Sequence, residues 1–114
     1  MARIRHYTAG RLTNPGANTV LADTGPIPED DQLFDVYATV RSSVGALIRC
    51  ELRDDTNTNT LELTELNVPA GNTVHIKMPF YIRKGQRIRL VLDAAITGNI
   101  TASLRLFLAL PWMA

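Results

Sequence analysis

The sequence has little of several residue types that would mark a function class. Cys50 is the only cysteine in 114 residues, which excludes an intrachain disulfide and argues against a cysteine-based metal site. We therefore expect Cys50 to be a small apolar side chain of the core.

No apolar run reaches the roughly 18 residues of a membrane-spanning helix, and residues 1–10 lack the apolar stretch of a secretory signal. We expect no membrane partner, and a protein made and kept in a cytoplasm unless it leaves inside a larger particle.

A strong excess of one charge is also missing. The chain holds 12 Lys and Arg against 11 Asp and Glu, a net charge of +1, so the whole molecule has no field that would attract nucleic acid. We expect no nucleic-acid partner. Apolar residues make up 46% and charged residues 20%, which is typical of one compact globular domain and not of a disordered chain.

What the sequence does have is alternation. Between Leu33 and Leu110, apolar and polar residues follow each other with a period of two, the pattern of strands with one buried and one solvated face. The alternation is clearest in residues 34–41, 46–53, 74–83 and 87–93. Turns rich in Gly, Asn, Asp and Ser separate these segments. With a short strand at residues 19–23, the pattern predicts an all-β, antiparallel β-sandwich of seven to eight strands with a jelly-roll or related Greek-key topology.

The last apolar segment, residues 100–110, fits two structures. Some of its residues would form a helical stripe, whereas every second residue from Ile100 to Leu110 is apolar. We favour a strand, because the alternation is complete and Pro111 ends the run.

Residues 1–18 differ from the rest of the chain. They are basic, contain Gly10, Asn14, Pro15 and Gly16, and lack a long apolar pattern. The sequence predicts an extended N-terminal arm over residues 1–18 and a β-sandwich domain over residues 19–114. Such an arm either frays or adds as a strand to a neighbouring sheet edge, and the sequence leaves both outcomes open.

Asp23-Thr24-Gly25 is the triplet that carries the catalytic carboxylate in aspartic proteases. In those enzymes two such loops face each other and two carboxylates share one proton, so a chain with one triplet would have to dimerise. Pro26 removes a backbone N–H beside the carboxylate, and a Gly-rich flap is missing. We expect the triplet to be a turn that closes a strand, with a dimeric aspartic protease as an alternative.

Other candidate chemistry is incomplete. Asp55, Asn57 and Asn59 have the spacing that begins a calcium loop, but the glycine and the glutamate that complete such a loop are missing, so we expect a polar hairpin tip, with a weak ion site as an alternative. His6 and His75 have no ligand or catalytic partner at a useful spacing. The sequence thus predicts no enzyme, no cofactor and no metal site.

The densest basic run lies at residues 83–89. We expect a solvated or subunit-contacting sheet face there, with Glu62, Glu65 and Asp93 as the carboxylates that neutralise it across strands. A nucleic-acid site is not favoured, because no aromatic stacking platform accompanies the run beyond Tyr81.

A carbohydrate- or ligand-binding sandwich is a further alternative. Such sites usually present exposed aromatic rings, and the candidates here are Tyr7, Tyr37, Tyr81 and Trp112. Trp112 follows the last apolar segment on a short tail. It either plugs the open end of the sandwich or anchors in a neighbouring subunit, and both interpretations stay open.

A resemblance to a known family is carried by the N-terminal arm and two further segments. These are A-N-T-V-L-A-D-T-G-P-I-P-E-D-D-Q-L-F-D-V-Y-A-T-V and V-P-A-G-N-T-V-H-I-K-M-P-F-Y-I-R-K-G-Q-R-I-R-L-V-L. With these features the chain resembles the small jelly-roll accessory proteins of tailed-phage virions, such as head decoration (cement) proteins. The second segment also resembles the closing strands of tumour-necrosis-factor-like and C1q-like jelly rolls.

The resemblance implies a non-enzymatic structural protein of a virion, made in the host cytoplasm. Its partners would be further copies of itself, most often in a homotrimer, and the major capsid protein, reached through the arm or one sheet face. The residues expected to make capsid or subunit contacts are Arg3, Ile4, Arg5, His6, Tyr7, Arg11, Trp112 and Met113.

Overall fold

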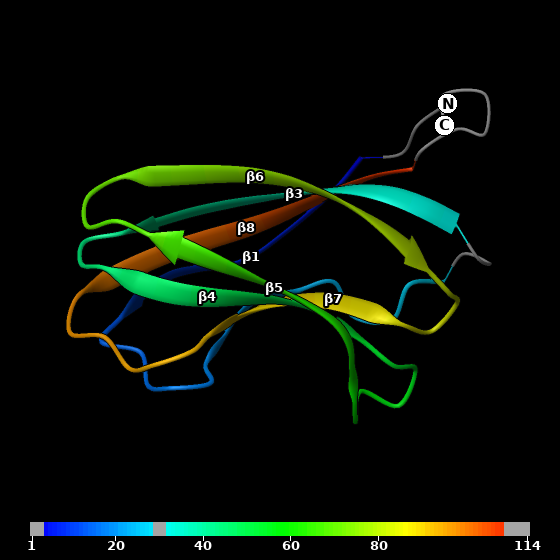
Figure 1. Cartoon of the computed structure of the whole chain (residues 1–114), viewed down its shortest axis with the longest axis horizontal. Helices are drawn as coiled ribbons and strands as arrows, with labels where there is room; N and C mark the ends of the chain where they lie inside the picture. The colour runs from blue at the N-terminus through cyan, green and yellow to red at the C-terminus, as the bar shows by residue number, and fades with distance from the viewer. Residues whose placement is uncertain (1–3, 29–31, 109–114) are drawn as a thin grey trace.

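Eight β-strands and no helix make up the part of the chain that the computed structural model describes, residues 4–28 and 32–108 (Figure 1). In chain order the strands are β1 (Ile4–Thr13), β2 (Val20–Asp23), β3 (Gln32–Ser42), β4 (Ala46–Arg53), β5 (Thr60–Val68), β6 (Thr73–Ile82), β7 (Arg87–Leu92) and β8 (Asn99–Leu108). Within those ranges no helix is long and apolar enough to cross a membrane.

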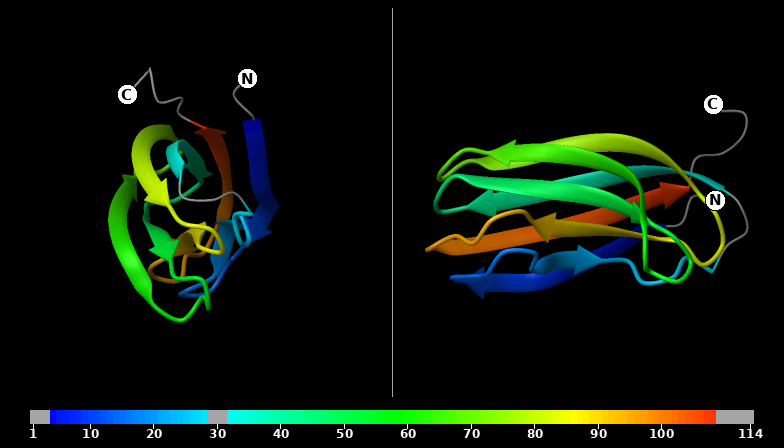
Figure 2. Two further views of the ribbon diagram at one scale, coloured as in Figure 1. Left: turned by 90° about the vertical axis from the view of Figure 1, so that its right-hand side faces the viewer. Right: turned by 60° about the horizontal axis from the view of Figure 1, so that its bottom comes forward.

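The strands form two four-stranded sheets, ordered β1-β8-β3-β6 and β2-β7-β4-β5. All neighbouring strands are antiparallel, and the sheets lie against each other as the two layers of a sandwich (Figure 2). The chain changes sheet at almost every turn, which is the jelly-roll arrangement. The predicted all-β, antiparallel sandwich is confirmed, with eight strands.

The core lies where the alternation predicts it. Val36, Ile48, Leu90 and Leu104 come from four different strands, and each is 0% exposed. A buried side chain of this size contributes on the order of 1.5–3 kcal/mol, so a one-residue slip of any strand would forfeit several such contributions. Cys50 is buried among these residues, as expected.

The segment with two possible structures is a strand. β8 lies in the interior of its sheet and pairs with β1 on one side and β3 on the other. Ile100, Ala102, Leu104 and Leu106 are all buried. Residues at every second position share one side in a strand but not in a helix, so burial of all four requires a strand.

The N-terminal segment differs from the arm predicted over residues 1–18. Residues 4–13 form β1, which pairs along β8 and belongs to the same sandwich. The chain therefore provides its own sheet edge for this segment, and residues 4–13 are not a separate arm.

A β-bulge explains why the sequence pattern missed β1. The bulge lies between Thr8 and Arg11, where β1 has one residue more than β8. This extra residue reverses the alternation, so Tyr7 and Leu12 both pack against the core although they are separated by an odd number of positions. Gly10 lies in the bulge with φ +81°, a backbone conformation that favours glycine.

Candidate functional site

Each sheet buries one side in the core and turns the other to solvent. We call the outward side of the β1-β8-β3-β6 sheet face A and that of the β2-β7-β4-β5 sheet face B. From the strand register, face A includes Leu33, Asp35, Tyr37, Thr39, Arg41, Thr73, His75, Lys77, Pro79, Tyr81, Thr101, Ser103, Arg105, Phe107 and Arg11. Face B includes Asp23, Leu47, Arg49, Glu51, Arg53, Leu63, Glu65, Asn67, Arg87, Arg89 and Val91.

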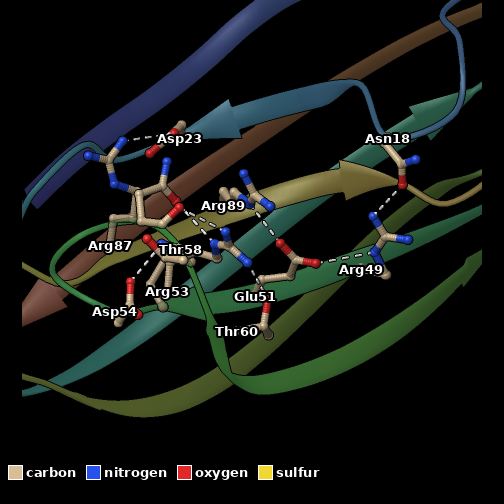
Figure 3. A network of polar contacts seen from close by, with 12 residues as sticks. Asn18, Asp23, Arg49, Glu51, Arg53, Asp54, Thr58, Thr60, Arg87 and Arg89 are labelled. Atoms are coloured by element: carbon tan, nitrogen blue, oxygen red, sulfur yellow. Dashed lines mark hydrogen bonds and ion pairs between the residues drawn. The ribbon is translucent and has the colours of Figure 1, made fainter.

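Glu51 is the centre of an ion-pair network on face B (Figure 3). Its side chain is 7% exposed, and Arg89 Nε donates to Glu51 Oε1 over 2.6 Å. Arg49 Nε lies 3.3 Å from Glu51 Oε2, while Arg49 Nη1 donates to Asp93 Oδ1 over 2.6 Å. A carboxylate this buried would be costly without its cations, so the arginines on either side of Glu51 are committed to it.

The other two arginines of face B also have partners. Arg87 Nη1 lies 3.3 Å from Asp23 Oδ2. Arg53 donates to the side-chain and backbone oxygens of Asn57 and to Thr60 Oγ1, at the base of the β4–β5 hairpin. Face B therefore meets solvent with its arginines already paired.

The basic run at residues 83–89 contributes its last two arginines to this network. They are neutralised across strands, as predicted, but by Glu51 and Asp23. The sequence had suggested other carboxylates. One of these, Asp93, pairs with Arg49 outside the run.

Asp23-Thr24-Gly25 forms the turn that ends β2. Gly25 N donates to Asp23 Oδ1 over 2.8 Å, and Thr24 Oγ1 accepts from Ile88 N over 3.1 Å. The second Asp23 oxygen faces Arg87. A protease dyad needs another carboxylate beside the first, and here a guanidinium takes that place. The predicted turn is confirmed, and it leads from β2 into the loop before β3.

The polar tip between β4 and β5 is a hairpin turn organised by Asp54. Its carboxylate accepts the backbone N–H groups of Thr58 over 2.7 Å and Asn59 over 3.1 Å. These bonds, the one from Thr58 above all, hold the pKa of Asp54 below its ordinary value. Asn57 is one of the residues with calcium-loop spacing, and both its side-chain and its backbone oxygen accept hydrogen bonds from Arg53. Among the described residues, no three His, Cys, Asp or Glu side chains are grouped so that they could hold a metal ion.

Face A consists of rows of side chains that cross the sheet. The central row places Tyr37 of β3 between Lys77 of β6 and Arg105 of β8. One end of the face carries Tyr81, which is 54% exposed, and the other end carries Arg41. At about 3.3 Å per residue, the outward residues of β3 span roughly 26 Å between these ends.

Tyr37 has both aromatic and cationic neighbours. Phe107 packs edge-on against it, with ring centroids 5.1 Å apart and an interplanar angle of 74°. Lys77 Nζ lies 5.8 Å and Arg105 Cζ 6.0 Å from the centre of the Tyr37 ring, both within cation–π distance. A hollow of about 160 Å³ lies against this ring and is also lined by Thr39 and His75 among other residues. We call it the Tyr37 hollow.

A second hollow, of about 500 Å³, lies at the Arg41 end of face A. It is lined by Arg11, Arg41, Ser43, Gly71, Asn99 and Thr101. We call it the arginine hollow. Across face A the described residues supply four cations, Arg11, Arg41, Lys77 and Arg105, and one carboxylate, Asp35. None of these cations forms an ion pair with a carboxylate of residues 4–28 or 32–108.

One of the predicted capsid- or subunit-contact residues lies in this candidate site. Arg11 is exposed and lines the arginine hollow, whereas Tyr7 is half-buried and packs against the core. Ile4, Arg5 and His6 lie on β1, and Arg3, Trp112 and Met113 lie outside the described residues. The contacts of these residues with other molecules stay predictions.

Two aromatic residues of face A were predicted from the sequence, but the residues around them were not. Tyr37 and Tyr81 were candidates as exposed aromatics, and alternation turned both of them outward. The neighbours of Tyr37 were missed, because only the pairing of β3 with β6 and β8 brings Lys77 and Arg105 to its ring. Alternation within a single strand carries no signal for this pairing.

Comparisons with known proteins give a fold. No family model matches the chain, and no curated protein is similar to it in sequence. The N-terminal cellulose-binding domain of Cellulomonas fimi β-1,4-glucanase C has a TM-score of 0.58 and 12% identity, over 93% of this chain and 87% of that domain. The C-terminal CBM6 of LamC from Zobellia galactanivorans has a TM-score of 0.55 and 14% identity, over 93% and 90%.

A viral structure shares the same fold. The structure of infectious bursal disease virus, Gx strain, matches with a TM-score of 0.50 and 14% identity, over 94% of this chain and 33% of the viral chain. At these identities the likenesses show the fold alone. The chain is a jelly-roll β-sandwich of the kind found in carbohydrate-binding modules and in this virus.

Proposed function

We propose that the chain is a non-enzymatic binding module that holds a carbohydrate on face A. The observation that carries the proposal is the Tyr37 hollow, where an aromatic ring, two cationic donors and the Thr39 hydroxyl meet on a sheet surface. A sugar presents apolar C–H faces and hydroxyl groups together, and an aromatic ring beside hydrogen-bond donors can recognise both. The cellulose-binding domain and the CBM6 with the same fold support this class of function.

Binding and not catalysis is proposed because of the groups around Tyr37. Nucleophilic catalysis needs an activated nucleophile, a base and a group that orients the base. The Thr39 hydroxyl lies 3.1 Å from His75 Nδ1, but no carboxylate of the described residues is bonded to His75. The surrounding cations suit recognition of a polar ligand.

The experiment that tests the proposal is affinity electrophoresis of the full chain against a panel of soluble neutral and acidic polysaccharides. We expect retardation by at least one polymer, and about tenfold weaker binding for Tyr37→Ala, because the ring contributes a large contact area. Leu63→Ala is the matched control, since Leu63 is 50% exposed on face B. The proposal fails if no polymer retards the chain, or if the folded Tyr37→Ala variant binds as the wild type does.

A structural role in a virus particle is the second candidate function. Leu61 and Leu63, each 50% exposed on the edge strand β5, favour it, because exposed apolar side chains at an open sheet edge are suited to contact another protein. In this proposal the chain is a homo-oligomer, a trimer in the expected case, that decorates a virion by contact with the major capsid protein. Trp112 and Met113 keep their predicted role as contact residues.

Light scattering on the full chain tests the second candidate. We expect a stable oligomer for the wild type and a smaller species for Leu61→Lys/Leu63→Lys, because charge at the edge opposes association. Val20→Lys is the control, since Val20 is 37% exposed on β2, at the opposite edge of the same sheet. A monomer that does not co-sediment with capsids would contradict this function. Deletion of residues 1–18 would be a poor test, because it removes strand β1 from the sandwich.

A further inference from the structure

The arginine hollow differs from the Tyr37 hollow in its chemistry. Its lining offers two guanidinium groups, two hydroxyls and one amide, and the described residues place no carboxylate in it. Its volume of about 500 Å³ exceeds the 160 Å³ of the Tyr37 hollow on the same face. Both hollows lie along β3 and β8, so one extended ligand could contact both.

Strand pairing brings the two arginines to the same side chain. Thr101 of β8 is the register partner of Arg11 on β1 and of Arg41 on β3. The backbones of β1 and β3 are therefore about 10 Å apart at this row, two strand spacings, a gap that two long arginine side chains can close from both sides. Arg11 and Arg41 are both exposed.

The bulge in β1 is what turns Arg11 toward face A. Tyr7 is the register partner of Leu104 and packs against the core, so without the bulge strict alternation would turn Arg11, four positions further on, inward as well. The extra residue moves Arg11 into register with Thr101. Bulges commonly re-aim a side chain near a functional site.

The donors in the hollow are held in place by contacts with their neighbours. Ser43 Oγ accepts from Asn99 N over 2.8 Å, which leaves the Ser43 hydroxyl hydrogen free to donate. A Cβ at Gly98 would collide with Ser43 Oγ, so glycine at this position keeps Ser43 where it is. Arg41 Nη1 donates to Thr73 Oγ1 over 3.3 Å, and a guanidinium has further N–H groups.

We propose that the arginine hollow binds the acidic group of the ligand, a carboxylate or a sulfate. Two guanidinium groups and a hydroxyl donor line it, and a planar or tetrahedral oxyanion is the group that such donors recognise best. Resting on the carbohydrate function proposed above, this inference makes the ligand an acidic polysaccharide, with its charged substituent between Arg11 and Arg41 and a neighbouring sugar near Tyr37.

Matched pairs of polymers test the inference on the full chain. Polygalacturonate is compared with its methyl ester, and dextran sulfate with dextran, so that the members of each pair share a sugar backbone and differ in the acidic group. We expect about tenfold or stronger preference for the acidic member of at least one pair, and the pair that responds identifies carboxylate or sulfate as the group. Arg11→Met and Arg41→Met should each remove about tenfold of that preference, because each removes a charge-assisted hydrogen-bond donor.

Lys84→Met is the charge-matched control, because Lys84 is exposed in the β6–β7 turn, far along the sheet from the hollow. It should bind as the wild type does. Equal binding of acidic and neutral polymers, or equal losses for Lys84→Met and Arg41→Met, would overturn the inference and leave the carbohydrate function standing.

A small-anion titration tests the hollow even if no polymer binds. Sodium galacturonate and sodium sulfate are titrated against the full chain, with sodium chloride as reference, while amide NMR shifts are recorded. We expect shifts at Ser43, Asn99 and Thr101 in the wild type and not in Arg41→Met. If these shifts occur but no polymer binds, the carbohydrate function fails and the anion site stands. If none occur, the anion site is overturned.

Discussion

Face A and face B both present arginines to solvent, but only on face B do the carboxylates of the described residues reach them. On face B, Glu51 lies between Arg49 and Arg89, and Asp23 pairs with Arg87 (Figure 3). On face A, the described residues supply four cations and one carboxylate, and two of the cations lie within cation–π distance of the Tyr37 ring. The two faces belong to sheets of equal size in one fold, so the difference lies in the outward residues alone.

The contrast between the two faces indicates which arginines can still bind a ligand. A guanidinium that is already bonded to a buried carboxylate would have to give up that bond before it could hold a ligand. Among the described residues, the arginines of face A have no carboxylate to give up: Arg41 donates to the neutral Thr73 hydroxyl, and Arg105 lies against the Tyr37 ring. Face B is therefore suited to stabilise the sandwich and face A to meet a partner.

Removal of the central carboxylate of face B should destabilise the chain most. Glu51→Ala leaves Arg49 and Arg89 close together without their shared anion. We expect the free energy of unfolding to fall by about 3 kcal/mol, the lower part of the range for a broken buried pair, because both arginines keep some access to water. Urea unfolding followed by circular dichroism measures it.

Glu65→Ala is the control for this prediction. Glu65 is the register partner of Arg49 on the same face, but it is exposed. Its removal should change the free energy of unfolding by less than about 0.5 kcal/mol. Equal losses for the two variants would mean that burial of Glu51 has no part in the stability of face B.

Cys50 reports the opening of the sheet beneath this network. Burial above all, and the charge of Glu51 next, raise the pKa of the Cys50 thiol to about 12, so the folded chain should react very slowly with a disulfide reagent near pH 8. Since about 1.4 kcal/mol corresponds to a factor of ten, Glu51→Ala should raise the labelling rate roughly 100-fold. Arg41→Met, on face A, should leave the rate unchanged. Fast labelling of the wild type would contradict this prediction, because it would mean that the network around Glu51 does not keep the sheet over Cys50 closed.

Much of the fold follows from the sequence because period-two alternation is a local signal. It placed Phe34, Ile48 and Leu104 in the core and identified β8 as a strand. β1 was missed where the local signal breaks, at the Thr8–Arg11 bulge. A bulge is specified by pairing with another strand, which a single segment does not encode.

The candidate site could be predicted only in part for the same reason. The outward positions of Tyr37 and Arg41 follow from alternation in one segment. Their neighbours Lys77, Arg105 and Arg11 come from three other strands, and the jelly-roll order decides which strands those are. The same holds on face B, where Glu51 and not the expected carboxylates neutralises Arg89.

Substitution of single arginines compares the two faces directly, with smaller expected changes in the free energy of unfolding. Arg89→Met should lower the free energy of unfolding by about 1–2 kcal/mol, because Glu51 keeps only Arg49. Arg11→Met and Arg41→Met should each change it by less than about 0.5 kcal/mol, since neither arginine has a carboxylate partner among the described residues. Thermal unfolding separates the two outcomes, at several degrees per kcal/mol for a domain of this size. A loss for Arg41→Met as large as that for Arg89→Met would contradict the division of roles.

The smallest expected effect lies at the hairpin tip that borders face B. The hydrogen bonds to Asp54, led by the one from Thr58, lower its pKa below the ordinary 3.8 in the folded chain. A lowered pKa means that the stabilisation is present above about pH 3.8 and is lost as the pH falls further. In Asp54→Asn this contribution is missing at every pH.

Unfolding measured at intervals from about pH 5 down to about pH 2.5 should therefore show a steeper loss for the wild type than for Asp54→Asn. Asp55→Asn, at the neighbouring exposed position, should follow the wild-type curve. If the wild-type and Asp54→Asn curves run parallel, the turn is held by the bonds from Arg53 to Asn57 and Thr60 and not by the carboxylate. The arginines of face B would then support the hairpin as well as the sheet.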